Sequence, residues 1–306
     1  MNSPSNLNKG DTVWIVTPAK ALPEKGIDEA IEILTSWGLK VKTGKNVYQK
    51  NGGFGGNDNQ RKSDVQQAIN DQSAKAIFMS RGGYGSVRII DELDFEPLIT
   101  NPKWIIGYSD ITYFHIKLNQ LNLASLHGTM PLEINYDASR AEAIEETKQL
   151  LFGTKSAFEF SGNEDNKEGF MVGEIVGGNL NIVHGNLGNI NKNFWNEKIL
   201  FLEEVGEEMY AVDRMLNNLK RAEVFERVQG VILGGFSSIK DTNNWFPNQS
   251  ILDVLNAFFS NYKKPVALNI SSGHIPGNWP LVFGENSKIK ISKSKVEIMY
   301  LNGKTH

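Results

Sequence analysis

The chain has 306 residues, a formal net charge of −3 and no cysteine. This length favours two domains, and the lack of cysteine excludes disulfides, zinc–thiolate sites and thiol nucleophiles. Lysine and arginine are scattered along the chain, so we expect neither nucleic acid nor a membrane as a partner. The N-terminal segment shows neither the pattern of a signal peptide nor an apolar run long enough to span a membrane, which predicts a soluble, cytoplasmic protein.

The first half predicts alternating strands and helices. Apolar runs predict strands over 12–18, 39–44, 75–80 and 103–109, and amphipathic patterns predict helices over 26–38, 57–72, 87–93 and 110–121. Such alternation predicts a parallel sheet with helices on both faces. Ligands bind beyond the carboxyl ends of the strands in these sheets. Two glycine turns, "SRGGYGS" and "GYSD", stand at such ends.

A polar, glycine-containing stretch over 156–169 predicts a linker between domains. We therefore expect an N-terminal α/β domain over 1–155 and a smaller C-terminal α/β domain over 170–306. In the latter, the pattern predicts strands over 198–204 and 228–237 and helices over 208–222 and 248–262, followed by strand and turn signals.

Ser109 stands at the tip of a predicted strand, two residues after Gly107. A serine before a helical pattern is typical of a helix N-cap. A Gly-x-Ser turn after a strand is also where many hydrolases hold a nucleophile, although the α/β-hydrolase elbow has a small residue two positions after the serine. Ile111 stands there in this chain, so the motif alone leaves both interpretations open.

A serine nucleophile needs a base, and the chain has five histidines. His115 lies on the helix after Ser109 and is expected to point away from its start. His127 and His184 adjoin glycines and are candidates. His274 lies in a loop rich in glycine and proline, which is suited to presenting a side chain rather than burying it.

An acid and an oxyanion site complete this chemistry. Glu203 and Glu204 follow an apolar strand, and strand alternation predicts that one faces inward and one faces solvent. An inward carboxylate would fix the tautomer of a histidine base. "SRGGYGS" lacks the lysine of a phosphate loop, but its backbone N–H groups and the amide of Asp110 are suited to an oxyanion. The histidines lack ligand spacing, so we expect no metal and no cofactor.

Together these segments resemble the LD-carboxypeptidases of peptidase family S66, which also contains the microcin C self-immunity peptidases. The resemblance runs over "GDTVWIVTPA", "RKSDVQQAIND", "AIFMSRGGYGSVRIID", "WIIGYSDIT", "SLHGTM", "GEIVGGNL", "ILFLEEVGEEMYAVDRML" and "GHIPGNWPLVFGE". The combination of R-G-G-Y-G, G-Y-S-D and a late G-H is far more specific than any single piece.

The resemblance implies that Ser109 is the nucleophile, Glu203 the orienting acid and His274 the general base. The backbone amides of Gly83 and Asp110 would be the oxyanion donors. It also implies that the N-terminal domain bears the serine, that the C-terminal domain bears the acid and the base, and that the active site lies between them. Members of the family are commonly homodimers.

The choice between the two glutamates stays open. The glutamate of the family is the first acidic residue after the strand, which points to Glu203. The family often has Glu-Asp at this place, whereas this chain has Glu203 followed by Glu204.

The implied reaction is removal of the C-terminal D-alanine from a muropeptide tetrapeptide, at an L,D bond, in the recycling of murein. One alternative is a microcin C immunity-type peptidase that cleaves an aminoacyl-nucleotide amide. Another is a non-catalytic, two-lobed ligand-binding protein in which Ser109 is a helix cap. The family usually has a Gly-Thr pair after "GGNL", where this chain reads "HGNLGN". This departure concerns substrate detail, and the sequence does not reveal the preferred third-position diamino acid.

Overall fold

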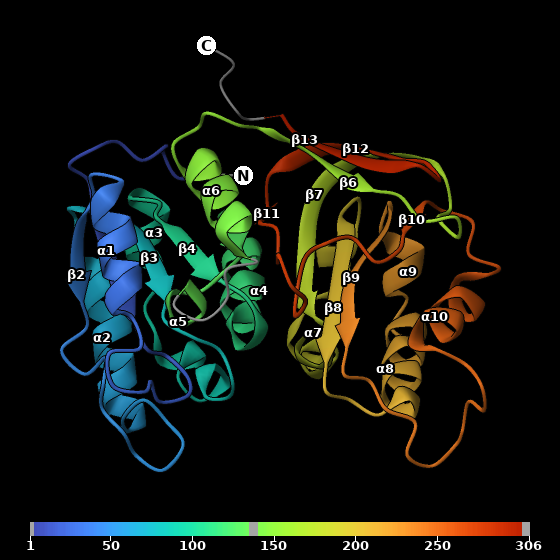
Figure 1. The fold of residues 1–306 in the computed structure, drawn as a ribbon, viewed down its shortest axis with the longest axis horizontal. Helices are drawn as coiled ribbons and strands as arrows, with labels where there is room; N and C mark the ends of the chain where they lie inside the picture. The colour runs from blue at the N-terminus through green and yellow to red at the C-terminus, as the bar shows by residue number, and fades with distance from the viewer. Residues whose placement is uncertain (1–2, 135–139, 302–306) are drawn as a thin grey trace. The chain divides into compact units, whose positions relative to one another are not determined.

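The computed structural model describes residues 3–134 and 140–301. The chain folds into two compact units, one of Met1–Lys155 with Pro276–Gly284 and one of Ser156–Ile275 with Glu285–Asn302. Both units combine a sheet with helices (Figure 1). The predicted α/β fold class is confirmed.

In the part of the first unit that the structure describes, six strands form one sheet in the order β11-β5-β4-β3-β1-β2. The strands are β1 (Thr12–Val16), β2 (Lys40–Thr43), β3 (Ala74–Met79), β4 (Trp104–Gly107), β5 (Ser125–His127) and β11 (Leu281–Phe283). Strands β1 to β5 pair in parallel, as the alternating pattern predicts, and β11 is antiparallel to β5. The carboxyl ends of β3 and β4 therefore open at the same edge of the sheet.

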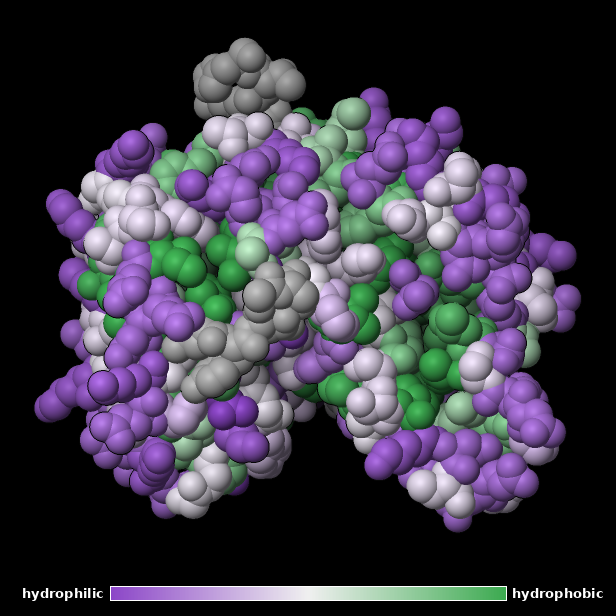
Figure 2. Space-filling view, viewed as in Figure 1, coloured by the Kyte–Doolittle hydropathy of each residue, from purple (hydrophilic) through white to green (hydrophobic). Residues whose placement is uncertain are grey.

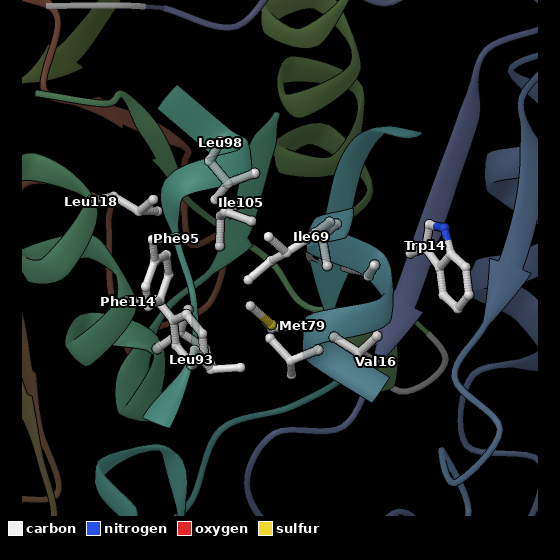
Figure 3. Close-up of a cluster of buried hydrophobic side chains, with 14 of the residues drawn as sticks. Trp14, Val16, Ile69, Met79, Leu93, Phe95, Leu98, Ile105, Phe114 and Leu118 are labelled. Atoms are coloured by element: carbon white, nitrogen blue, oxygen red, sulfur yellow. The ribbon is translucent and has the colours of Figure 1, made fainter. Parts of the chain in front are cut away.

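Helices cover this sheet on the faces that their apolar stripes dictate. They are α1 (Asp28–Ser36), α2 (Asp58–Asn70), α3 (Glu96–Thr100), α4 (Thr112–Gln120), α5 (Pro131–Ile134) and α6 (Ala141–Leu151). Figure 3 shows side chains of α2, α3 and α4 packed with those of β1, β3 and β4 in one core cluster. Val65, Ala68 and Ile69 are buried there, as the pattern of α2 predicts.

The segment 87–93, which the sequence predicts as a helix, forms two 3-10 turns instead, η1 (Ser86–Arg88) and η2 (Ile90–Glu92). Leu93 follows with extended backbone angles, so no helix can propagate beyond the second turn. A third 3-10 turn, η3 (Ser109–Ile111), joins β4 to α4.

In the described residues of the second unit, seven strands form one sheet in the order β10-β9-β8-β7-β12-β13-β6. They are β6 (Ala157–Ser161), β7 (Gly169–Asn179), β8 (Ile199–Val205), β9 (Gly230–Ser237), β10 (Val266–Ala267), β12 (Asn286–Ile291) and β13 (Lys295–Tyr300). Strands β7 to β10 are parallel, whereas β12, β13 and β6 add to β7 in antiparallel pairs.

The helices predicted over 208–222 and 248–262 are present in the second unit, whose described residues also form two helices that were not predicted from the sequence. The helices of this unit are α7 (Leu180–Gly185), α8 (Met209–Arg221), α9 (Val224–Arg227) and α10 (Ile251–Phe259), with 3-10 turns η5 (Leu187–Asn189) and η6 (Lys192–Trp195). Helix α10 begins three residues later than predicted because Ser250 and Asp253 form a capping box at its start.

The predicted linker over 156–169 needs correction, because it contains β6. Phe158 and Phe160 are buried and alternate with exposed neighbours, and β6 pairs with β13. The polar and glycine residues that suggest a linker lie after the strand. The domain limits also differ from the prediction, since Pro276–Gly284 belong to the first unit.

Polar side chains cover much of the surface of each unit in the view of Figure 2. No helix among residues 3–134 and 140–301 has the length and apolar character required to cross a bilayer.

Candidate active site

Ser109 begins the turn η3, directly between β4 and α4. Its φ of +64° lies in the left-handed region, which costs a residue other than glycine about 1–2 kcal/mol. A strained strand-to-helix turn of this kind exposes the nucleophile of α/β-hydrolases. Ile111 does not prevent the turn, because Gly107 leaves room for it: a Cβ at Gly107 would lie 2.9 Å from Cγ1 of Ile111.

The helix-cap interpretation of Ser109 is wrong. The residue that caps α4 is Ile111, and neither η3 nor α4 receives a side-chain cap hydrogen bond. The Ser109 side chain is partly exposed, and within the described ranges its hydroxyl has no hydrogen-bond partner. The strained turn therefore presents a hydroxyl that no structural contact uses.

The glycine loop after β3 lies against this turn. A Cβ at Gly82 would come 2.9 Å from Cβ of Ser109, 3.0 Å from its Oγ and 3.4 Å from the backbone nitrogen of Asp110. The amides of Gly83 and Asp110 donate no hydrogen bond to any residue that the structure describes. Unpaired N–H groups beside a hydroxyl are what an oxyanion site requires.

The carboxylate of Asp110 joins the turn to the loop. Its Oδ2 accepts a hydrogen bond of 2.8 Å from the backbone N–H of Ser86. Burial raises the pKa of Asp110, and the Ser86 hydrogen bond opposes this effect. The side chain of Asp110 therefore holds the glycine loop, while its backbone amide remains available to an oxyanion.

A buried histidine supports the strand that carries the turn. Nε2 of His115 donates to the carbonyl oxygen of Gly107 at 2.8 Å, and Nδ1 accepts from the hydroxyl of Ser125 at 2.8 Å. The expectation that His115 points away from the start of α4 is therefore wrong. Because a carbonyl oxygen only accepts, these two bonds fix the neutral tautomer with its proton on Nε2.

This environment predicts a loss of stability in mild acid. Burial lowers the pKa of His115 from 6.5 to about 4, opposed by the hydrogen bond to Gly107. Below pH 6.5 the unfolded chain takes up a proton that the folded chain refuses, so His115 lowers the free energy of unfolding by about 2 kcal/mol between pH 7.5 and pH 5. Urea unfolding at both pH values should show a smaller loss for His115→Gln. An equal loss in both proteins would contradict this assignment.

In the second unit, β8 carries Glu203 and the loop after β10 carries His274. Oε2 of Glu203 accepts hydrogen bonds from Nδ1 of His274 at 2.6 Å and from its backbone N–H at 3.1 Å. Ser237 on β9 donates to the His274 carbonyl oxygen at 2.6 Å. A carboxylate accepts only, so Nδ1 carries the proton and Nε2 carries the basic lone pair of the neutral ring.

Gly273 makes this pair possible. Its φ is +105°, and a Cβ there would lie 2.8 Å from Cβ and 2.9 Å from Oε2 of Glu203. Any side chain at this position would push the loop of His274 away from the carboxylate. The sequence signal for this contact is the glycine of "SSGHIPG", directly before the histidine.

Glu204 lies elsewhere. It accepts hydrogen bonds of 2.8 Å from Nδ2 of Asn179, from the backbone of Asn181 and from the backbone of Val205. Burial raises the pKa of Glu204 to about 7, and these hydrogen bonds oppose that effect. The structure thus pairs His274 with Glu203 and directs Glu204 toward the start of α7.

The expectation that one of the two glutamates faces solvent is wrong, because Glu203 and Glu204 are both buried. Strand β8 lies between β7 and β9 and is buried along almost its whole length, so both of its faces are covered. Helix α7 also covers the end of β8.

The other two candidate histidines, His127 and His184, pack against or bond to neighbouring side chains of their own unit. His127 is buried, with its ring centroid 5.3 Å from that of Phe283 and 6.1 Å from that of His115. Nε2 of His184 lies 3.0 Å from Nδ2 of Asn218 on α8. In the described part of the chain no group of three or more metal-binding side chains is placed to hold an ion. The structure therefore gathers Ser109, Gly83 and Asp110 in the first unit, and Glu203 and His274 in the second.

Comparison with known proteins matches two successive segments of the chain to two domains of one family. Residues 13–128 match the LD-carboxypeptidase N-terminal domain, and residues 172–289 match the LD-carboxypeptidase C-terminal domain. A Bacillus subtilis protein named "Probable murein peptide carboxypeptidase" is 32% identical over 275 residues, which cover 89% of this chain and 86% of the relative. The "Murein tetrapeptide carboxypeptidase" of Pseudomonas aeruginosa is 25% identical over 287 residues, which cover 88% and 90% of the two chains.

Two solved structures share the fold. A muramoyltetrapeptide carboxypeptidase from Oxalobacter formigenes has a TM-score of 0.82 at 24% identity, covering 94% of this chain and 97% of its own. A MccF-like protein from Bacillus anthracis has a TM-score of 0.83 at 22% identity, covering 98% and 100%. At these identities the likeness concerns the fold alone.

The fold and these matches define a carboxypeptidase built from two α/β domains. The chain belongs to the LD-carboxypeptidase family, peptidase family S66. The resemblance inferred from the sequence motifs is confirmed.

Proposed function

We propose that the chain is a serine carboxypeptidase that removes the C-terminal D-alanine from muropeptide tetrapeptides, at the L,D bond. The names of its murein peptide and murein tetrapeptide carboxypeptidase relatives support the substrate class. The observation that carries the mechanism is the 2.6 Å contact between Glu203 and Nδ1 of His274. It prepares an imidazole as a base in a chain that also holds Ser109 in a strained turn.

In the proposed acylation step, Oγ of Ser109 attacks the scissile carbonyl carbon while Nε2 of His274 takes the hydroxyl proton. Glu203 stays ionised and stabilises the imidazolium that forms. The negative oxygen of the tetrahedral intermediate binds to the amides of Gly83 and Asp110. Each well-placed donor of this kind lowers the activation free energy by about 3–4 kcal/mol.

The intermediate then collapses as the C–N bond breaks. The imidazolium of His274 gives its proton to the nitrogen of the departing D-alanine, and an ester to Ser109 remains. A water molecule attacks this ester, His274 accepts its proton, and the tripeptide leaves as Ser109 regains its hydrogen. A cytoplasmic location in murein recycling and a homodimeric state remain predictions.

A pair of tetrapeptides that differ only at the last α-carbon tests the proposed substrate. Inversion at this carbon exchanges the positions of the carboxylate and the methyl group, which leaves a buried partner of the carboxylate unpaired at a cost of roughly 1–3 kcal/mol. We expect release of D-alanine about 5- to 150-fold faster than release of L-alanine, as measured by mass spectrometry.

The Ser109→Ala protein is the control, because it preserves the binding surface and lacks the proposed nucleophile. Equal rates on the two tetrapeptides would contradict the LD-carboxypeptidase proposal. An aminoacyl-nucleotide amide belongs in the same assay. Faster cleavage of that compound than of the D-alanine peptide would instead favour the microcin C immunity-type activity.

A further inference from the structure

Arg61, on the first turn of α2, is a buried cation, whereas arginine side chains usually lie at the protein surface. The residue is 1% exposed, and its guanidinium carbon lies 5.0 Å from the centre of the Phe54 ring. Burying a charge is costly unless partners satisfy it. The contacts that satisfy Arg61 therefore show what it holds.

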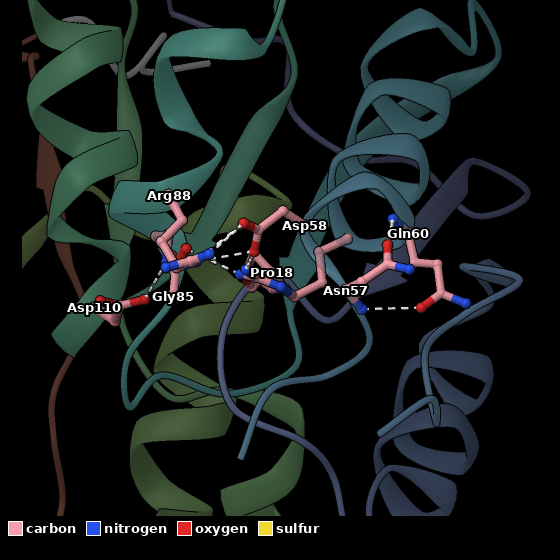
Figure 4. Close-up of polar contacts among 9 residues, drawn as sticks. Pro18, Asn57, Asp58, Gln60, Gly85, Arg88 and Asp110 are labelled. Atoms are coloured by element: carbon pink, nitrogen blue, oxygen red, sulfur yellow. Dashed lines mark hydrogen bonds and ion pairs between the residues drawn. The ribbon is translucent and has the colours of Figure 1, made fainter. Parts of the chain in front are cut away.

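Those contacts are mainly backbone carbonyls of the loops around the candidate oxyanion site. Nη1 of Arg61 donates to the carbonyl oxygen of Pro18 and, at 2.9 Å, to that of Gly85. Nη2 pairs with the carboxylate of Asp58. Pro18, Gly85 and Asp58 converge in Figure 4. Arg61 thus joins the loop after β1 to the glycine loop after β3.

The glycine loop is shaped for this contact. Gly85 has a φ of +145°, and a Cβ there would lie 2.6 Å from Nη1 of Arg61. The next residue, Ser86, donates its N–H to the carboxylate of Asp110 at 2.8 Å. Arg61 and Asp110 therefore hold two adjacent residues of the loop, one by its carbonyl and the other by its amide.

A second arginine, Arg88, binds the same carboxylate as Arg61 from the more exposed side. Nε and Nη2 of Arg88, in η1, bond the carboxylate of Asp58 at 3.0 and 2.7 Å, and its guanidinium lies 5.4 Å from the Phe54 ring centre. Asp58 thereby links Arg61 and Arg88 across the chain segment that contains Gly85. Gly83 lies two residues before Gly85, and its amide donates no hydrogen bond within the described residues.

We propose that Arg61 is a positioning residue for the oxyanion site. By holding the Gly85 carbonyl, Arg61 fixes the amide of Gly83 relative to that of Asp110. This inference rests on the proposed function for the role of the two amides. Arg61 touches no reacting atom in this arrangement. Its effect should therefore fall on the transition state, because an oxyanion donor displaced by about 1 Å loses most of its effect on the rate.

The test uses Arg61→Lys, which keeps the positive charge and loses the planar fork that reaches Pro18 and Gly85 together. The first measurement is the rate at which a fluorophosphonate labels Ser109, since this reaction places a phosphoryl oxygen in the oxyanion site without any peptide. The second is deuterium uptake by the loop 82–86. We expect labelling slower by about 10²-fold and faster exchange in the loop.

Lys103→Met is the matched control. Lys103 is also a buried cation that bonds backbone carbonyls, those of Ala68 and Ile69 at the other end of α2. Its replacement should lower stability while labelling of Ser109 stays at the wild-type rate. Gly85→Ala provides a second route, because its Cβ would displace Nη1 of Arg61 and should slow labelling as well.

Labelling of Arg61→Lys at the wild-type rate, or unchanged exchange in the loop, would overturn the inference. This outcome differs from a failure of the proposed function. A wild-type protein that is labelled at Ser109 and does not cleave the D-alanine tetrapeptide would remove the substrate proposal and leave the role of Arg61 to be decided by the labelling rates. A wild-type protein that is not labelled at Ser109 would overturn both.

Discussion

Ser109→Ala is expected to lower kcat by a factor on the order of 10⁶, as loss of the nucleophile does in other serine triads. The substitution removes only a hydroxyl that has no hydrogen-bond partner among the described residues and keeps the backbone of η3. The free energy of unfolding should therefore change by no more than about 0.5 kcal/mol. Steady-state kinetics on the D-alanine tetrapeptide and urea unfolding measure the two quantities.

The strained backbone gives a second readout at the same position. Ser109→Gly should also be inactive, but it should be more stable than Ser109→Ala by about 1 kcal/mol, because glycine tolerates positive φ. Asn122 is the matched control, since its φ is +58° and it lies at the far end of α4. Asn122→Gly and Asn122→Ala should both keep full activity. Near wild-type turnover in either Ser109 variant would remove Ser109 as the nucleophile.

Glu203→Gln is expected to lower kcat by about 10⁴-fold, which is the effect of the corresponding amide in another triad. An amide can donate to Nδ1 of His274 and so favour the tautomer whose proton sits on Nε2, where the base needs a lone pair. It also removes the charge that stabilises the imidazolium. Kinetics on the D-alanine tetrapeptide measure the loss, and circular dichroism during urea unfolding shows whether the fold persists.

Glu204→Gln is the comparison for this prediction. The carboxylate of Glu204 accepts hydrogen bonds from Asn179, Asn181 and Val205, so an amide there should reduce stability. The contact between Glu203 and His274 remains in that variant, and kcat of the folded protein should fall far less than for Glu203→Gln. The reverse order of effects would assign the orienting acid to Glu204.

The alternating pattern of the first half predicts its parallel sheet well, because buried parallel strands and amphipathic helices have distinct periods. Ser109 also stands out in the sequence, because a Gly-x-Ser turn directly follows a predicted strand. Local pattern fails for β6, where two phenylalanines alternate within a polar stretch. The strand exists because β13, more than a hundred residues later, supplies its partner.

The supporting residues of the site are hidden from sequence analysis for a related reason. The position of Arg61 in α2 suggests a charged surface residue, and only the fold brings it to the carbonyls of Pro18 and Gly85. His115 likewise carries no signal for its bond to Gly107. The distinction between Glu203 and Glu204 depends on the loop that brings His274, 71 residues later, against Glu203, a contact that the residue pattern of β8 does not report.

Strand β11 determines when the first sheet can be completed during biosynthesis. It pairs with β5 and is made of residues 281–283, roughly 150 residues after β5 in the chain. At a synthesis rate of about 5–20 residues per second, the ribosome reaches β11 roughly 8–30 s after β5. The backbone groups of β5 on that side have no strand partner in the nascent chain during this interval, and an open strand edge invites pairing with other chains. Rapid translation or a chaperone bound at this edge would therefore increase the yield of folded protein, and a fragment that stops before residue 281 would keep the edge exposed.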